Sequence, residues 1–168
     1  MSDVAILVST PTAIWNNIPA LGLTSHNSYQ KEIMKWARIL ESMGITYDVL
    51  ILGMNRIFST DWAERLGGYK LIIAPELTHI SPKDLEKIEE YLQMGGRLIV
   101  TPNFARYNQY GEPLPRILVE RILSRPSVAI VETSSGIKDL VAQMLPIRTI
   151  YIESPEGISQ SLFASQNS

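Results

Sequence analysis

A glutamate and a histidine close together in the chain are the side chains whose types best suit chemistry. Glu76 comes two residues after the predicted strand 70–74, and His79 follows shortly after it. A carboxylate and an imidazole at the end of one buried strand could form a polar site, with Glu76 as the leading functional carboxylate. The competing interpretation is structural, with Glu76 accepting hydrogen bonds from loop amides.

The composition removes several other chemistries. The chain has no cysteine, so disulfides, thiolate metal sites and cysteine nucleophiles are all excluded. Its two histidines, His26 and His79, have no partner at metal-binding spacing, and we expect no metal site. Neither a G-x-S-x-G, a G-x-G-x-x-G nor a Walker motif occurs, so a serine hydrolase lacks support and no cofactor is expected.

Further polar side chains stand at or just beyond the ends of predicted strands. Ligands of parallel α/β folds bind at that edge of the sheet, so these positions predict a cleft for a small molecule or a sugar. An enzyme using a carboxylate there is the rival hypothesis. The ligand-binding candidates are Ser9, Thr10, Glu76, His79, Thr101, Asn103 and Glu132.

The segment after the first predicted strand, Ser9-Thr10-Pro11-Thr12, could in principle hold a phosphate, as in a flavodoxin-type FMN site. Such a site needs free backbone N–H groups that run into the start of a helix. Pro11 removes one donor, and the prolines and asparagines of 10–27 predict a long loop with no helix before residue 28. We therefore expect no phosphate site there.

Charge and hydropathy restrict the partners. A net charge of −2 and a pI near 5.7 give no basic field for nucleic acid or an anionic membrane surface. The N-terminal segment lacks the features of a signal peptide, and no apolar run reaches the roughly 18 to 20 residues that span a bilayer. These features predict a cytoplasmic protein, and abundant isoleucine without cysteine leans weakly towards a thermophilic source.

Apolar runs alternate with amphipathic segments along most of the chain. This alternation predicts an α/β three-layer sandwich, flavodoxin-like, with a mainly parallel sheet of five to six strands in the order 2-1-3-4-5. We expect one domain over 1–153 and a loose polar tail over 154–168. The predicted strands are 3–9, 46–52, 70–74, 97–101, 127–131 and 148–152, and the predicted helices are 28–43, 60–66, 82–94, 116–123 and 137–145.

Aromatic side chains gather in the two predicted loops, 10–27 and 103–115. Aromatic residues are enriched in interface cores, so we consider Trp15, Phe104, Tyr107 and Tyr110 as interface candidates. The predicted strand 148–152 also has no lysine or proline to protect an edge from pairing. Together they predict a homo-oligomer, a dimer or a trimer. The alternatives are that the aromatics pack on their own domain or form a platform for a sugar.

The central part of the chain also resembles a known family. The stretch Tyr69-Lys70 with its apolar run to Pro75-Glu76-Leu77, a helix that starts at Ser81, and Gly95-Gly96 before the run to Thr101 carry this resemblance. They are similar to the trimerisation (middle) domain of family 42 β-galactosidases, within the class I glutamine amidotransferase-like superfamily. The match is good over about residues 30–105 and follows element order elsewhere.

This resemblance implies a flavodoxin-like fold without intrinsic chemistry, because such domains join subunits and help to wall a neighbour's active site. The catalytic barrel of the galactosidases is not found in this sequence. The place of the amidotransferase cysteine falls near Thr101-Pro102. The leading hypothesis is therefore a stand-alone, non-catalytic oligomerisation or accessory module, with ligand binding or carboxylate catalysis at the strand ends as alternatives.

Overall fold

A sheet of five parallel strands forms the centre of the computed structural model, which describes residues 2–17, 28–53, 62–133 and 135–145. The strand order is β2-β1-β3-β4-β5, as the sequence predicts. All four neighbouring pairs are parallel. The strands are β1 (Val4–Ser9), β2 (Tyr47–Leu52), β3 (Leu71–Ala74), β4 (Arg97–Val100) and β5 (Val128–Ile130).

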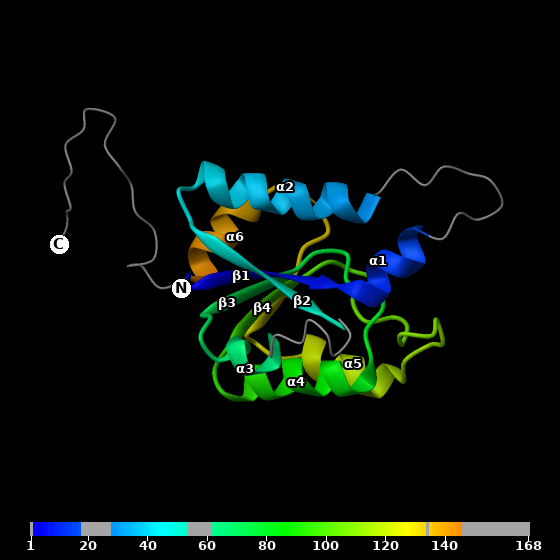
Figure 1. Cartoon of the computed structure of the whole chain (residues 1–168). Coiled ribbons are helices and arrows are strands. Elements are labelled where there is room, and N and C mark those ends of the chain that lie inside the picture. The colour runs from blue at the N-terminus through cyan, green and yellow to red at the C-terminus, as the bar shows by residue number, and fades with distance from the viewer. Residues whose placement is uncertain (1, 18–27, 54–61, 134, 146–168) are drawn as a thin grey trace, which may run out of the picture.

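Helices cover both faces of the sheet, which makes a three-layer α/β sandwich (Figure 1). One layer holds α2 (Ser28–Ser42) and α6 (Ile137–Met144), and the other holds α3 (Trp62–Leu66), α4 (Pro82–Gln93) and α5 (Arg116–Leu123). The remaining helix, α1 (Thr10–Asn17), projects from the carboxyl end of β1. No helix in the described part of the chain is both long and apolar enough to cross a membrane.

Alternation of side chains along each strand supplies two separate cores. On β1, Val4 and Ile6 face α2 and α6, whereas Ala5 and Leu7 face the layer of α3, α4 and α5. All four side chains are fully buried, which explains why this strand is a continuous apolar run in the sequence. The largest side chain of the α2 core is Trp36, which is 1% exposed.

The helix α4 starts and ends where its sequence signals predict. The N–H of Asp84 donates to the Ser81 hydroxyl at 3.1 Å, and Pro82 occupies the first helical position. After the helix, the chain must pass closely beneath the ring of Tyr91, and a Cβ at Gly96 would overlap that ring. The glycine therefore allows β4 to begin directly against its own helix.

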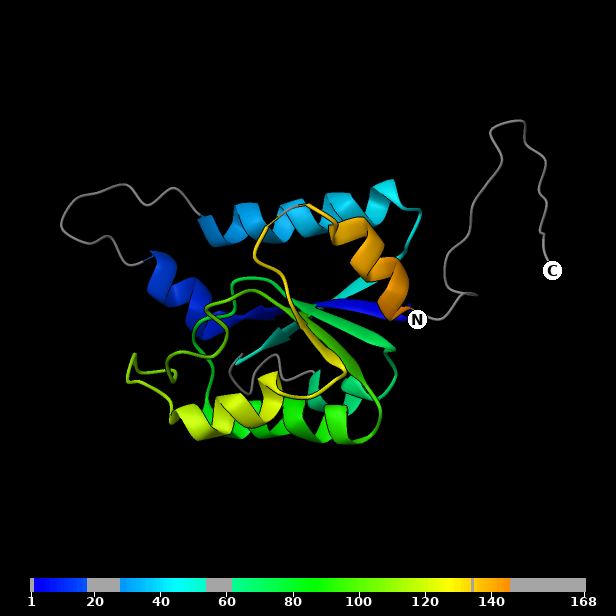
Figure 2. The ribbon, with the colours of Figure 1, turned by 180° about the vertical axis from the view of Figure 1, so that it is seen from behind.

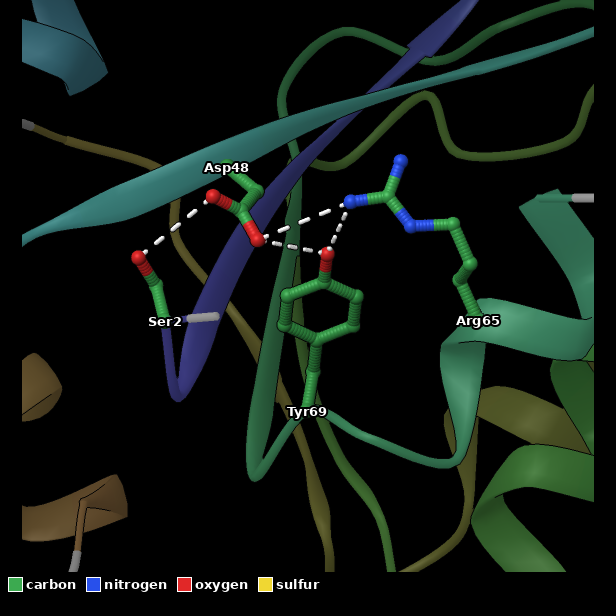
Figure 3. A network of polar contacts seen from close by, with 4 residues as sticks. All are labelled: Ser2, Asp48, Arg65 and Tyr69. Carbon is green, nitrogen blue, oxygen red and sulfur yellow. Dashed lines mark hydrogen bonds and ion pairs between the residues drawn. The ribbon is translucent and has the colours of Figure 1, made fainter. Parts of the chain in front are cut away.

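A polar network fixes the amino-terminal edge of the sheet (Figure 3). The Tyr69 hydroxyl donates to Asp48 Oδ2 at 2.7 Å and accepts from Arg65 at 2.8 Å. The hydrogen bond from Tyr69 is the largest cause that holds the pKa of Asp48 below its usual value. Asp48 lies near the start of β2, and Tyr69 lies just before β3. The network therefore connects the starts of the two strands that flank β1.

One expectation about the fold is wrong. The sequence predicts a loop from Thr10, but α1 begins there without any intervening turn. The N–H of Thr12 donates to Ser9 Oγ at 3.2 Å, so Ser9 caps the helix, and Pro11 lies in the first turn where it removes no helical hydrogen bond. The expected strand 148–152 and tail 154–168 lie outside the described residues.

Candidate functional site

A hollow of about 490 Å³ opens at the carboxyl ends of β1 and β3. It lies between α1, the start of α2, the turn after β3 and the segment after β4. In Figures 1 and 2, α1 and the segment 103–115 lie at this same end of the sheet. Its lining residues are Trp15, Asn16, Ser28, Tyr29, Glu32, Glu76, Thr78, His79, Asn103, Arg106 and Tyr107.

The position of this hollow follows from the strand order. The connection from β1 leads to β2 on one side, and the next strand, β3, pairs with β1 on the other side. The order in which strands are added to the sheet therefore reverses at β1, and the segments that leave β1 and β3 diverge. Ligands of open α/β sheets bind at such a switch point. The hollow thus lies at the switch point of this sheet.

The peptide group of His79 is the fixed point of the site. The hydroxyls of Ser9 and Thr12 both donate to the His79 carbonyl, at 2.5 and 3.0 Å. In turn, the His79 N–H donates to Thr12 Oγ1 at 3.0 Å. The end of β1 is held as well, because the N–H of Ser9 donates to the Tyr29 hydroxyl at 2.8 Å. These bonds lock the turn after β3 against α1 and α2.

Three aromatic rings form one wall. The imidazole of His79 stacks on Trp15 with ring centroids 5.4 Å apart and on Tyr107 with centroids 4.9 Å apart. Burial lowers the pKa of His79, which favours its neutral form, and Thr78 Oγ1 lies 2.8 Å from its Nδ1. Trp15 Nε1 donates to the Gln109 carbonyl at 3.1 Å. The stack therefore joins α1, the turn after β3 and the segment after β4.

Glu76 stands in an unusual backbone conformation. Its φ is +44°, one of two positive values at non-glycine residues in the described part of the chain. The preceding Pro75 forms a turn with it, and the N–H of Glu76 donates to Thr101 Oγ1 at 2.9 Å. This bond holds the strained turn between β3 and β4, so that the Glu76 side chain lines the hollow.

A second hollow of about 310 Å³ adjoins the first and shares Glu32 and Glu76 with it. Its other side is formed by residues after β4 and β5, including Thr101 and Glu132. Glu32 pairs with Lys35 at 2.8 Å. Among the described residues, no group of three or more His, Asp or Glu side chains could hold a metal ion.

The structure brings together most of the ligand-binding candidates. Glu76, His79 and Asn103 line the first hollow, and Glu76, Thr101 and Glu132 line the second. Ser9 is fully buried and its hydroxyl is used internally, and neither hollow is lined by Thr10. The competing structural role for Glu76 is carried in the described residues by its backbone, because its N–H, and not its carboxylate, bonds to Thr101.

The interface candidates divide in a similar way. Tyr110 is 72% exposed and Trp15 is 40% exposed, whereas Tyr107 is half-buried in the stack. Phe104 is 1% exposed and belongs to the core beneath α4 and α5, so it is not available as an interface residue. A buried aromatic in a segment without regular structure gives no sequence signal that separates it from an exposed one.

Sequence reasoning missed several site residues. Tyr29, Glu32 and Arg106 line the first hollow but lie in α2 or far along a loop. The two α2 residues lie near the start of the helix, and nothing in the helical periodicity distinguishes them from solvated positions. The missed helix α1 does have a signal, because Ser9 and Pro11 repeat the cap-and-proline pattern that correctly predicts α4.

The fold and the position of the hollow define an α/β protein of the doubly wound, parallel-sheet class. Within this class, residues 2–112 match the family model of the β-galactosidase trimerisation domain. The chain belongs to that family. A comparison with curated protein sequences found no match.

Solved structures with a similar fold include β-galactosidases. One from Bifidobacterium adolescentis is 18% identical with a TM-score of 0.56, and covers 74% of this chain and 54% of its own. A GH42 enzyme from G. stearothermophilus, solved as a catalytic mutant, is 20% identical with a TM-score of 0.53 over 68% of this chain and 15% of its own. One from a Rahnella species is 24% identical with a TM-score of 0.52, over 68% and 16%. The chain thus spans less than two thirds of the length of each of these relatives.

Proposed function

We propose that this chain acts as an oligomerisation or accessory module that associates with further copies of itself. The observation that carries the proposal is the match of residues 2–112 to a family named for trimerisation. The proposed module has no thiol chemistry of its own, since the chain has no cysteine.

Exposed apolar side chains support the proposal. Ile14 is 55% exposed and Trp15 40% exposed on α1, and Tyr110 is 72% exposed on the neighbouring segment. On the edge strand β2, Val49 and Ile51 are 47% and 41% exposed. Tyrosine and tryptophan are enriched in the cores of interfaces. We expect each interface to bury more than about 1,000 Å² in total.

Light scattering coupled to size exclusion tests this function. We expect a mass close to two or three times 18.9 kDa, with dissociation on dilution through the micromolar range. Tyr110→Asp and Ile14→Asp would shift the mass towards the monomer if the α1 end forms the interface. A mass near 18.9 kDa at every concentration would contradict the proposal.

Ligand binding in the hollow at the strand ends is the second candidate function. It is favoured by the position of a 490 Å³ hollow at the switch point between β1 and β3. The relatives are named as β-galactosidases, which makes sugars the first compounds to test. Saturable thermal stabilisation by one compound from a set of sugars, nucleotides and amino acids, lost in Glu76→Ala, is the expected result. A flat response from every compound would argue against ligand binding.

A further inference from the structure

Two opposite charges line the first hollow without meeting each other. Glu76 and Arg106 are both lining residues, yet they form no ion pair within 4.0 Å. Within the described ranges, no other charged side chain pairs with either of them. The third charged lining residue, Glu32, has its own partner in Lys35 at 2.8 Å. The hollow is therefore lined by one half-buried carboxylate residue and one exposed guanidinium residue that have no ionic partner among the described residues.

The backbone has an unusual conformation at or next to each of these two charged residues. The two non-glycine residues with positive φ in the described chain are Glu76 at +44° and Ala105 at +53°, and Ala105 directly precedes Arg106. These strained positions are coupled, since the N–H of Ala105 donates to the Leu77 carbonyl at 2.8 Å. The fold thus keeps the segments carrying the two charges in register while the charges stay apart.

From these charges, we propose that the first hollow binds a small zwitterion, a molecule that carries one ammonium and one carboxylate group. Its ammonium would lie against Glu76 and its carboxylate against Arg106, whose planar guanidinium suits bidentate binding of a carboxylate. This inference rests on ligand binding as the second candidate function. A neutral sugar would give neither charge an ionic partner, whereas a zwitterion would form an ion pair with each of them.

The remaining lining matches such a molecule. Asn103 and Asn16 add amide groups that can donate and accept hydrogen bonds. The wall built by Trp15 and Tyr107 offers apolar surface beside the polar groups. A volume of about 490 Å³ falls within the usual size of small-molecule sites and exceeds that of a free amino acid.

A series of zwitterions with increasing charge separation tests the inference. The probes are glycine, β-alanine, γ-aminobutyrate and 6-aminohexanoate, measured by isothermal titration calorimetry on the full chain. We expect saturable binding with an optimum at one spacing, set by the distance between Glu76 and Arg106. Acetate and methylamine, which carry one charge each, should bind more weakly than the best zwitterion.

Variants that remove one charge each locate the binding. Glu76→Gln and Arg106→Gln should each weaken the best probe at least about tenfold, the loss expected for one charged hydrogen bond. Glu90→Gln is the control, because Glu90 is an exposed carboxylate on α4 that pairs with Lys87 and lines neither hollow. Each variant is first checked by circular dichroism and thermal unfolding. A Glu76→Arg, Arg106→Glu double variant, in which the charges are exchanged, should recover part of the lost affinity.

Three outcomes would overturn the inference. They are binding of no zwitterion, equal binding by Glu76→Gln and the parent, and binding of galactose or glucose in preference to every zwitterion. The last outcome would leave ligand binding in the hollow intact and reject only the zwitterion. Oligomeric mass is measured separately, so self-association stands or falls independently of this result.

Discussion

The indole of Trp15 lies 5.4 Å from the imidazole of His79, centroid to centroid, and their planes are inclined by only 11°. Gly111 packs against the six-membered ring of the same indole, because a Cβ at this glycine would lie 2.6 Å from Trp15 Cζ2. With neighbours this close, Trp15 is a clamp between α1 and the segment after β4. The alternative that it forms a platform for a sugar ring is disfavoured.

Replacing Trp15 with alanine should lower the free energy of unfolding by about 1–3 kcal/mol. The change removes the stack on His79 and the bond to the Gln109 carbonyl, which are each worth about 1 kcal/mol. Urea unfolding followed by circular dichroism measures the loss. Tyr110→Ala is the control, and with a side chain 72% exposed it should change stability by less than about 0.5 kcal/mol. Equal effects of the two changes would contradict the clamp.

A pair of glycine substitutions isolates the close contact at the indole. Gly111 and Gly95 have positive φ values of +82° and +96°, so alanine is strained at both, at a cost of about 1 kcal/mol. Only Gly111→Ala also places a Cβ against Trp15, since nothing lies within 4 Å of a Cβ at Gly95. We expect Gly111→Ala to destabilise the protein by about 1–3 kcal/mol more than Gly95→Ala. Thermal unfolding of both variants decides this.

Two buried tyrosines should make the protein sensitive to alkali. Burial raises the pKa of Tyr29 and of Tyr91 to about 12, from 10.0. A raised pKa in the folded state means that stability is fully present below pH 10 and is lost as the pH rises through 12. Absorbance at 295 nm, recorded against pH, should show these two tyrosines ionising last, together with unfolding.

Tyr91→Phe provides the variant for this test. It removes a hydroxyl that lies 3.1 Å from the Arg97 carbonyl and 3.2 Å from the Tyr69 carbonyl, so we expect a loss of about 1 kcal/mol near neutral pH. The variant should also lose less additional stability between pH 10 and pH 12 than the parent chain. If stability falls as steeply with pH in the variant as in the parent chain over that range, Tyr91 does not cause the alkaline loss of stability.

Acid sensitivity should depend on the bond between Tyr69 and Asp48. Because the folded-state pKa of Asp48 is lowered, its contribution to stability is present above its usual pKa of 3.8 and is lost as the pH falls through the folded-state value. Tyr69→Phe removes the largest cause, so the pKa of Asp48 should rise towards its usual value. Carboxyl carbon NMR measures this directly. Tyr47→Phe, which removes a hydroxyl bonded to Glu41 instead, should leave the pKa of Asp48 unchanged.

Glycine at position 76 should stabilise the chain. The φ of +44° at Glu76 is unfavourable for any residue with a Cβ, so Glu76→Gly should raise the free energy of unfolding by about 0.5–1 kcal/mol. Glu76→Ala removes the same carboxylate and retains the strain, so it should show no such gain. A larger stability for the alanine variant would contradict strain at this position.

The strand order and most elements could be predicted from the sequence because their signals are local. Ser81-Pro82 starts α4, the helix 116–123 matches α5 (Arg116–Leu123) at both ends, and the buried run of β3 is apolar throughout. The helix α1 was missed because the prolines and asparagines of 10–27 outweighed the cap at Ser9. Composition averaged over a long segment hides a short helix at one end of it.

The candidate site was predictable where it depends on strand ends and not where it depends on packing. Glu76 and Asn103 follow strands, and the fold brings both to the same hollow. Arg106 and Tyr29 reach it only because the segment after β4 folds back and α2 packs over β1. Those are tertiary arrangements, and neither the residue types nor their spacing in the sequence predicts them.

The hydrogen bonds of the His79 peptide group affect how fast a ligand could enter the hollow. Both hydrogen-bonding groups of this peptide are used, and the turn that carries them is fixed to α1 before any ligand arrives. Entry of a small molecule would therefore require little ordering of this turn. We expect association at a rate limited by diffusion and desolvation, with a single exponential phase in stopped-flow measurements and a rate that rises linearly with ligand concentration.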